Sequence, residues 1–183
     1  MLDIEKESRL EFTIAEMTVD DIEPATKMRL QSWLDTYVNE EAGISREWIG
    51  QRNIEQLSPE KTQSRHDRFL EGKMCGTFDA WVAKDASGKI IGSTTPFVDS
   101  EGRQRVGSIY VDKDWLGEGV GGRLMQKVVD WFDSSKPIEL TVVSYNERAK
   151  AFYRKWGFEE VPNSDGLHDD VIPEIRMIRR AGK

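Results

Sequence analysis

One stretch of the sequence decides the fold, Ser108-Ile-Tyr-Val-Asp-Lys-Asp-Trp-Leu-Gly-Glu-Gly-Val-Gly-Gly-Arg-Leu-Met125. It begins with a short apolar run at 109–111 that predicts a strand. Four glycines follow, at positions 117, 119, 121 and 122, and after them apolar residues recur at the spacing of a helix. A glycine turn between a strand and a helix leaves backbone N–H groups unpaired at the positive end of the helix dipole. We therefore predict an anion site that holds a pyrophosphate.

The composition indicates a globular protein with one domain. The chain has 183 residues, 38% of them hydrophobic, and six tryptophans, which is enough for one substantial core. Residues 1–10 predict a flexible leader, and residues 11–183 a single domain. The charged N-terminus has no apolar signal core, no apolar run approaches the roughly 20 residues that span a bilayer, and Cys75 is alone. We expect a cytoplasmic protein without a membrane partner.

Charge and histidine content argue against two further partners. The formal net charge is −7 at pH 7, whereas binding to a nucleic-acid backbone normally requires a basic face. We therefore expect no nucleic-acid partner. His66 and His168 are far apart in the sequence and have no neighbouring pair of ligands, so no metal site is predicted.

The apolar patterns predict an α/β (α+β) fold with a mixed, mostly antiparallel sheet of about six to seven strands and helices on both faces. Two hairpins join the three strands before the glycine stretch. The predicted strands cover residues 11–15, 78–84, 90–98, 104–111, 138–143, 158–161 and 174–178. The predicted helices cover 20–38, 46–57, 58–70 and 147–156, and a further helix follows the glycines and ends at about residue 134. Residues 162–170 are expected to form a polar loop.

Two other phosphate-binding loops and a plain turn compete as explanations of the glycines. A Walker loop continues as Gly-Lys-Ser/Thr, but Gly122 is followed by Arg123 and Leu124. The dinucleotide loop of an oxidoreductase requires an acid at the far end of the next strand, and the strand at 138–143 has its acid at the start. A plain turn would not require four glycines within six residues, because each glycine adds a conformational entropy cost.

Two motifs resemble those of the GNAT superfamily, the acetyl-CoA-dependent N-acetyltransferases. The segment from Val111 to Leu124 resembles motif A, although Leu116 stands where the family has Gln or Arg. The segment Asn146-Glu-Arg-Ala-Lys-Ala-Phe-Tyr-Arg-Lys-Trp-Gly-Phe-Glu159 resembles motif B, Asn-x-x-Ala-x-x-Phe-Tyr-x-x-x-Gly-Phe, at every fixed position. By element order the resemblance extends over residues 12–178. It implies a GNAT-like fold that binds acetyl-CoA as co-substrate, without a metal.

The resemblance also implies how the cofactor is held. In the family the fourth and fifth strands splay apart, the pantetheine arm pairs with the fourth strand, and backbone N–H groups of the glycine turn bind the pyrophosphate. An asparagine and a tyrosine of the following helix complete the site. The residues so implied are Ile109, Tyr110, Val111, Gly117, Glu118, Gly119, Val120, Gly121, Gly122, Asn146 and Tyr153.

Tyr153 is the predicted catalytic residue. An amine that attacks a thioester expels a thiolate, and a phenol within hydrogen-bond reach can donate a proton to the leaving sulfur. A buried, hydrogen-bonded tyrosine of the core is the alternative role. The base that receives the proton of the amine is left open among Asp112, Glu139 and a water chain.

Aromatic residues of the first two helices are the candidates for the acceptor pocket, which these helices line in the family. Trp33 and Tyr37 are the predicted substrate-binding residues. The nearby acids Asp35, Glu40 and Glu41 could attract a cationic amine, or they simply face solvent.

The function that follows is an N-acetyltransferase that moves the acetyl group of acetyl-CoA to a primary amine by direct attack. The sequence does not identify the amine; we favour a small molecule over a protein N-terminus. A non-catalytic acyl-CoA sensor or interaction module is the alternative. The family also implies a homodimer as one assembly.

Overall fold

The computed structural model describes residues 11–182, so the predicted leader at 1–10 lies outside the described residues. The helices and strands follow the predicted order closely. The strands are β1 (Phe12–Glu16), β2 (Trp81–Asp85), β3 (Ile90–Val98), β4 (Gln104–Val111), β5 (Ile138–Val143), β6 (Phe158–Glu160), β7 (Gly166–His168) and β8 (Ile172–Arg179). The helices are α1 (Ile22–Thr36), α2 (Arg46–Gln56), α3 (Pro59–Cys75), α4 (Val120–Trp131) and α5 (Glu147–Lys155).

The strands form one mixed sheet in the order β1-β2-β3-β4-β5-β8-β6, with β7 paired to β8. All pairs are antiparallel except β4 with β5. The predicted fold class is confirmed. The eighth strand is β7, a three-residue strand within the segment 162–170 that the sequence predicts as a loop. It forms because Gly166 and His168 pair with Glu174 and Ile172 of β8, a tight hairpin whose short first strand has no alternating apolar pattern.

The parallel pair β4–β5 is short, and it opens the sheet at its centre. The two strands pair only through Gln104 with Ile138 and Arg105 with Glu139. Beyond Arg105, β4 continues to Val111 along β3, without a partner on its β5 side. β5 instead pairs along its whole length with β8.

A β-bulge at Gly107 lies where β4 leaves β5. Thr95 is opposite Ser108 and Pro96 is opposite Val106, which leaves Gly107 as the extra residue. A Cβ at Gly107 would lie 2.7 Å from the carbonyl oxygen of Thr95, so only glycine fits here. A bulge bends its strand and increases the local twist, which helps to turn the end of β4 away from β5.

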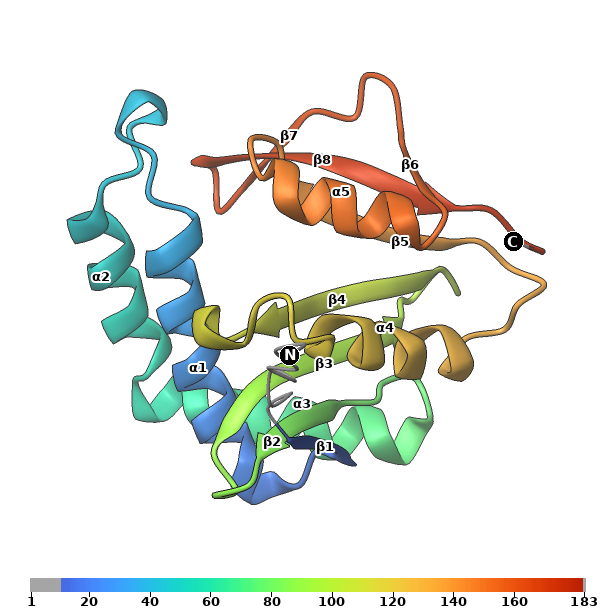
Figure 1. The fold of residues 1–183 in the computed structure, drawn as a ribbon, viewed down its shortest axis with the longest axis horizontal. Coiled ribbons are helices and arrows are strands. Elements are labelled where there is room, and N and C mark those ends of the chain that lie inside the picture. Colours follow the sequence, from blue (N-terminus) through green and yellow to red (C-terminus); the bar gives the residue numbers. More distant parts are fainter. Residues whose placement is uncertain (1–10, 183) are drawn as a thin grey trace, which may run out of the picture.

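Helices cover both faces of the sheet, as predicted (Figure 1). On one face, α1 and α3 pack on β2 and β3 through a core that includes Ile22, Phe69 and Val82. On the other face, α4 and α5 lie together over β4, β5 and β8 around a second core that includes Met125 and Leu140. Among residues 11–182 there is no helix long and apolar enough to cross a membrane.

Candidate active site

Residues 117–119 form an exposed turn that leads into α4, which begins at Val120. Gly117 has φ of 92° and Gly119 has φ of 86°, in the left-handed region that glycine adopts without a steric penalty. Gly119 is the N-cap of α4. A Cβ at Gly117, Gly119 or Gly122 would meet no atom within 4 Å. A ligand can therefore approach the backbone of this turn closely.

The first turn of α4 offers backbone N–H groups to an anion. The first hydrogen bond of the helix runs from the N–H of Arg123 to the carbonyl of Gly119 at 3.1 Å. The N–H groups of Val120, Gly121 and Gly122 precede it and lie at the positive end of the helix dipole. The structure thus gathers the glycine residues of the predicted site at one helix N-terminus. That they bind a pyrophosphate stays a prediction.

Leu116 lies just before this turn, and its side chain is 39% exposed. It ends the short 3-10 helix Lys113–Trp115. Glu118, the next side chain along, is also exposed. At the position where the family has Gln or Arg, this chain therefore presents an apolar surface beside the anion site.

Successive side chains at the free end of β4 point to opposite faces of the sheet. Ile109 and Val111 pack toward α4, whereas Tyr110 packs with Trp33 and Tyr37 of α1. The three strand residues pair with β3 on one edge only. An unpaired strand edge can accept an extended chain through main-chain hydrogen bonds, as the prediction for the pantetheine arm requires.

All four tyrosines of the chain gather at this opening, and we call Tyr37, Tyr110, Tyr145 and Tyr153 the tyrosine cluster. The hydroxyl oxygens of Tyr37 and Tyr110 are 3.3 Å apart. The Tyr145 hydroxyl donates to the carbonyl of Tyr37 at 2.7 Å. The indole Nε1 of Trp33 donates to the Tyr110 hydroxyl at 2.9 Å. The structure therefore places the two predicted acceptor residues, Trp33 and Tyr37, against the predicted cofactor residue Tyr110.

Tyr153 reaches the cluster from α5, and its side chain is only 8% exposed. Burial raises the pKa of Tyr153, and the nearby Tyr110 raises it further. Its ring packs against the rings of Phe152 and Phe158, with centroids 5.4 and 5.9 Å away. No hydrogen bond joins its hydroxyl to another residue within 11–182. The phenol therefore remains protonated, and its proton is not committed to a core hydrogen bond.

Tyr37 shares this environment. Burial raises the pKa of Tyr37, and the neighbouring Tyr110, Tyr153 and Tyr145 raise it in turn. Burial also raises the pKa of Tyr145, so Tyr37, Tyr145 and Tyr153 are neutral around pH 7, because a phenol with a raised pKa holds its proton.

His168 is a member of this site that sequence reasoning missed. Its ring lies edge-on to Trp33, with centroids 5.6 Å apart. Nδ1 is 3.9 Å from Glu174 and Nε2 is 3.5 Å from Asp169. The contact depends on β7, which no local pattern predicts, so the sequence carries no signal that links His168 to Trp33.

Asn146 is the N-cap of α5, where its side-chain oxygen accepts a hydrogen bond from the N–H of Ala149 at 3.1 Å. It follows Tyr145 directly, which places it at the edge of the tyrosine cluster. A contact with the pantetheine arm stays a prediction.

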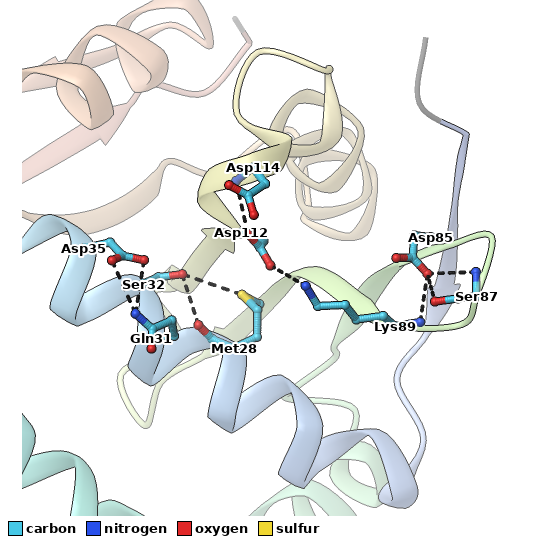
Figure 2. Close-up of polar contacts among 9 residues, drawn as sticks. All are labelled: Met28, Gln31, Ser32, Asp35, Asp85, Ser87, Lys89, Asp112 and Asp114. Atoms are coloured by element: carbon cyan, nitrogen blue, oxygen red, sulfur yellow. Dashed lines mark hydrogen bonds and ion pairs between the residues drawn. The ribbon is translucent and has the colours of Figure 1, made fainter. Parts of the chain in front are cut away.

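Asp112, one of the predicted bases, lies outside the cluster. Figure 2 shows its carboxylate turned toward Lys89, at 3.0 Å, and toward the backbone N–H of Asp114, at 3.1 Å. Burial acts to raise the pKa of Asp112, but these hydrogen bonds and the Lys89 charge outweigh it and lower that pKa. Asp112 lines a separate cavity of about 390 Å³ beside α1, together with Asp35. A carboxylate fixed in this way is a poor acceptor for the proton of a distant amine.

Glu139, the other predicted base, lies opposite Arg105 at the paired end of β4 and β5. Its carboxylate is 3.8 Å from Arg105 and 4.0 Å from Arg176. The structure does not bring it to the open end with Tyr153. The predicted acids Glu40 and Glu41 are exposed on a 3-10 turn, so they face solvent. Among residues 11–182, no group of His, Cys, Asp or Glu could hold a metal ion.

Part of the chain matches a known protein family. Residues 76–160, which include the glycine turn and all of α5, match the family model described as an acetyltransferase (GNAT) domain. The PaiA N-acetyltransferase of Thermoplasma acidophilum, solved with coenzyme A, is 20% identical with a TM-score of 0.72, and the match covers 93% of this chain and 99% of that chain. Residues 76–160 therefore match a GNAT acetyltransferase domain, and the fold of the chain resembles that of this solved N-acetyltransferase.

Two further proteins are similar to this chain. A GNAT phosphinothricin acetyltransferase of Sinorhizobium meliloti, solved with acetyl-CoA, has 17% identity and a TM-score of 0.67, over 93% of this chain and 89% of that chain. A UPF0039 protein of Schizosaccharomyces pombe is 31% identical over 100 residues, which are 52% of this chain and 63% of the relative. The chain therefore spans less than two thirds of the length of this curated relative.

Proposed function

We propose that the protein is an N-acetyltransferase that moves the acetyl group of acetyl-CoA to a primary amine by direct attack. The observation that carries the proposal is the opening between β4 and β5, which has the glycine turn at one end and the buried Tyr153 beside it. Structural neighbours solved with coenzyme A or acetyl-CoA support the choice of cofactor.

Acetyl-CoA would lie along the unpaired edge of β4. The N–H groups of residues 117–122 would bind the pyrophosphate, as unpaired donors at a helix N-terminus do. The pantetheine arm would then run back along 109–111 and accept main-chain hydrogen bonds from that edge, with Asn146 beside it. The arm would end near the bulge at Gly107, which places the thioester at the centre of the sheet.

The transfer would proceed in one displacement. The nitrogen lone pair of the amine attacks the thioester carbonyl carbon, the C–N bond forms, and the C–S bond breaks as the electron pair leaves with sulfur. Tyr153 donates its phenolic proton to that sulfur, and the nitrogen releases its own proton to water. The raised pKa of Tyr153 keeps the phenol in the protonated form that this role requires. Positioning of the two reactants supplies much of the remaining rate.

A non-catalytic acyl-CoA sensor is the second candidate, and two observations favour it. Leu116 replaces a polar side chain beside the anion site with an exposed apolar one. The carboxylates predicted as bases, Asp112 and Glu139, are both held in ion pairs away from the tyrosine cluster.

A panel of amines separates the two candidates. The purified chain is incubated with acetyl-CoA and each amine, and thiol release is followed together with acetylation of the amine by mass spectrometry. An enzyme releases coenzyme A in proportion to acetylated amine. A sensor gains melting temperature from acetyl-CoA but acetylates nothing. Stabilisation by a nicotinamide cofactor and not by acetyl-CoA would contradict both.

A further inference from the structure

A cavity of about 600 Å³ lies beside the bulge of β4, on the face of the sheet that α1 and α3 cover. Gly107 and Ser108 of β4 and Thr95 of β3 line it on the sheet side. The hydroxyls of Thr95 and Ser108 are hydrogen-bonded to each other at 2.7 Å. Residues of α1 and α3 line the opposite side.

Three arginines line this cavity, Arg29 from α1 and Arg65 and Arg68 from α3, against a single carboxylate, Glu71. Among the ion pairs of residues 11–182, none involves any of the three arginines. This is unusual for a chain whose formal net charge is −7, since its acids outnumber its cations. The cavity is thus a local concentration of positive charge that the protein itself does not neutralise.

The surroundings of Arg65 show that this charge lacks a complete set of acceptors. One Nη atom donates to the carbonyl of Gln56 at 2.5 Å and the other to its side-chain oxygen at 3.4 Å. Its Nε is buried without a hydrogen-bond partner. Burial lowers the pKa of Arg65, and the positive charges of Arg29 and Arg68 lower it further. A bound anion would relieve both the missing acceptor and the repulsion.

The cavity meets the proposed path of acetyl-CoA at its reactive end. With the pyrophosphate at 117–122 and the arm running back along 109–111, the thioester comes to lie near Ser108 and Gly107. The same two residues line the arginine cavity. A molecule whose anionic group is held by the arginines can therefore place another of its groups beside the thioester.

We infer that the acceptor amine belongs to a molecule that also carries an oxyanion, a carboxylate or a phosphate, and that Arg29, Arg65 and Arg68 bind this group. The inference rests on the proposed acetyltransferase function and specifies its substrate class. A cationic acceptor, which the acids near Trp33 would suggest, is not favoured. Glu40 and Glu41 face solvent, and Asp35 lies in the separate cavity beside α1.

Matched acceptors test the inference. Amino acids are compared with their primary amides, and phosphoethanolamine with ethanolamine, so that each pair differs in the anionic group and shares the amine. We expect kcat/KM for an anionic acceptor to exceed that of its neutral partner about tenfold or more. The pair with the larger ratio identifies carboxylate or phosphate as the group that is bound.

Arginine variants assign the effect to the cavity. Arg29→Gln and Arg68→Gln should each lower the anionic-to-neutral ratio about tenfold, because each removes a charge-assisted hydrogen bond. Arg180→Gln, an exposed change beyond β8, should retain the wild-type ratio. Melting temperature and the Kd of acetyl-CoA report that the variants are folded.

The outcomes separate the inference from the function on which it rests. Two results would overturn the inference but not the acetyltransferase function. In the first, anionic acceptors and their neutral counterparts are acetylated with equal kcat/KM. In the second, neither Arg29→Gln nor Arg68→Gln changes the ratio of kcat/KM between them. Acetyl-CoA binding without acetylation of any acceptor would overturn the proposed function, and the inference with it.

Discussion

The indole Nε1 of Trp33 donates a hydrogen bond to the hydroxyl oxygen of Tyr110 at 2.9 Å, and this bond ties α1 to the free end of β4. Trp33 is 5% exposed, so this hydrogen bond is largely shielded from bulk water. The Tyr110 hydroxyl lies 3.3 Å from that of Tyr37 as well. One phenol therefore connects the proposed acceptor wall to the strand along which the cofactor is proposed to lie.

Tyr110→Phe should lower the free energy of unfolding by about 1–3 kcal/mol, because it leaves the buried N–H of Trp33 without an acceptor. Tyr145→Phe is a matched control that also removes one hydroxyl. It frees only the carbonyl of Tyr37 and should cost about 1 kcal/mol. Urea titrations of the three proteins measure the difference. A Tyr110→Phe protein as stable as wild type would show that the bond contributes nothing.

Gly107→Ala should destabilise the protein by about 1–3 kcal/mol, the usual cost of overpacking a fitted site. The added methyl would lie 2.7 Å from the carbonyl oxygen of Thr95 and would displace the bulge that turns β4 away from β5. Gly50→Ala, in α2, has no atom within 4 Å of its new Cβ. It should stabilise the chain by about 0.5–1 kcal/mol. Thermal unfolding of both variants measures these shifts, and equal effects would contradict the steric argument.

Leu116→Arg should lower the Kd of acetyl-CoA about threefold to tenfold, because a guanidinium beside the glycine turn can pair with phosphate oxygens. The gain should shrink with added salt. Leu57→Arg introduces the same charge at a position of similar exposure, 40% against 39%, outside the glycine turn. Calorimetric titration of both variants gives the comparison. Equal Kd values of acetyl-CoA for Leu116→Arg and Leu57→Arg would contradict a position of residue 116 beside the phosphates.

Asp112→Asn should cost about 0.5 kcal/mol at neutral pH, since it removes a partly screened ion pair with Lys89 and keeps an amide oxygen for the cap. The pKa of Asp112 is lowered in the folded chain. Its contribution is therefore complete above the ordinary value of 3.8 and is lost as the pH falls through the folded value. Urea midpoints of wild type and variant should converge as the pH falls below about 4. A difference in urea midpoint that stays constant with pH would show that the charge of Asp112 is not its cause.

The sequence predicted the parts of the molecule that local patterns encode. The glycine turn before α4 was evident from four glycines and the helical period after them, because backbone conformation there depends on its own residues. Asn146, which the family resemblance implies as a cofactor residue, is the N-cap of α5 in the structure, a position that asparagine commonly occupies. The succession of helices and strands along the chain, apart from β7, follows from the same patterns.

The remaining parts arise from contacts between distant segments. Arg29, Arg65 and Arg68 meet only because α1 and α3 pack on the same face of the sheet. His168 reaches Trp33 because β7 pairs with β8. Neither arrangement has a periodic signal, so neither could be predicted from one sequence.

The most direct test of the account is the kcat of Tyr153→Phe with an amine that the wild-type protein acetylates, measured together with the Kd of acetyl-CoA. If Tyr153 is the general acid, kcat falls about a hundredfold or more, with an unchanged Kd of acetyl-CoA. A variant that retains the wild-type kcat, or one that loses activity only because acetyl-CoA binds more weakly, would contradict that role.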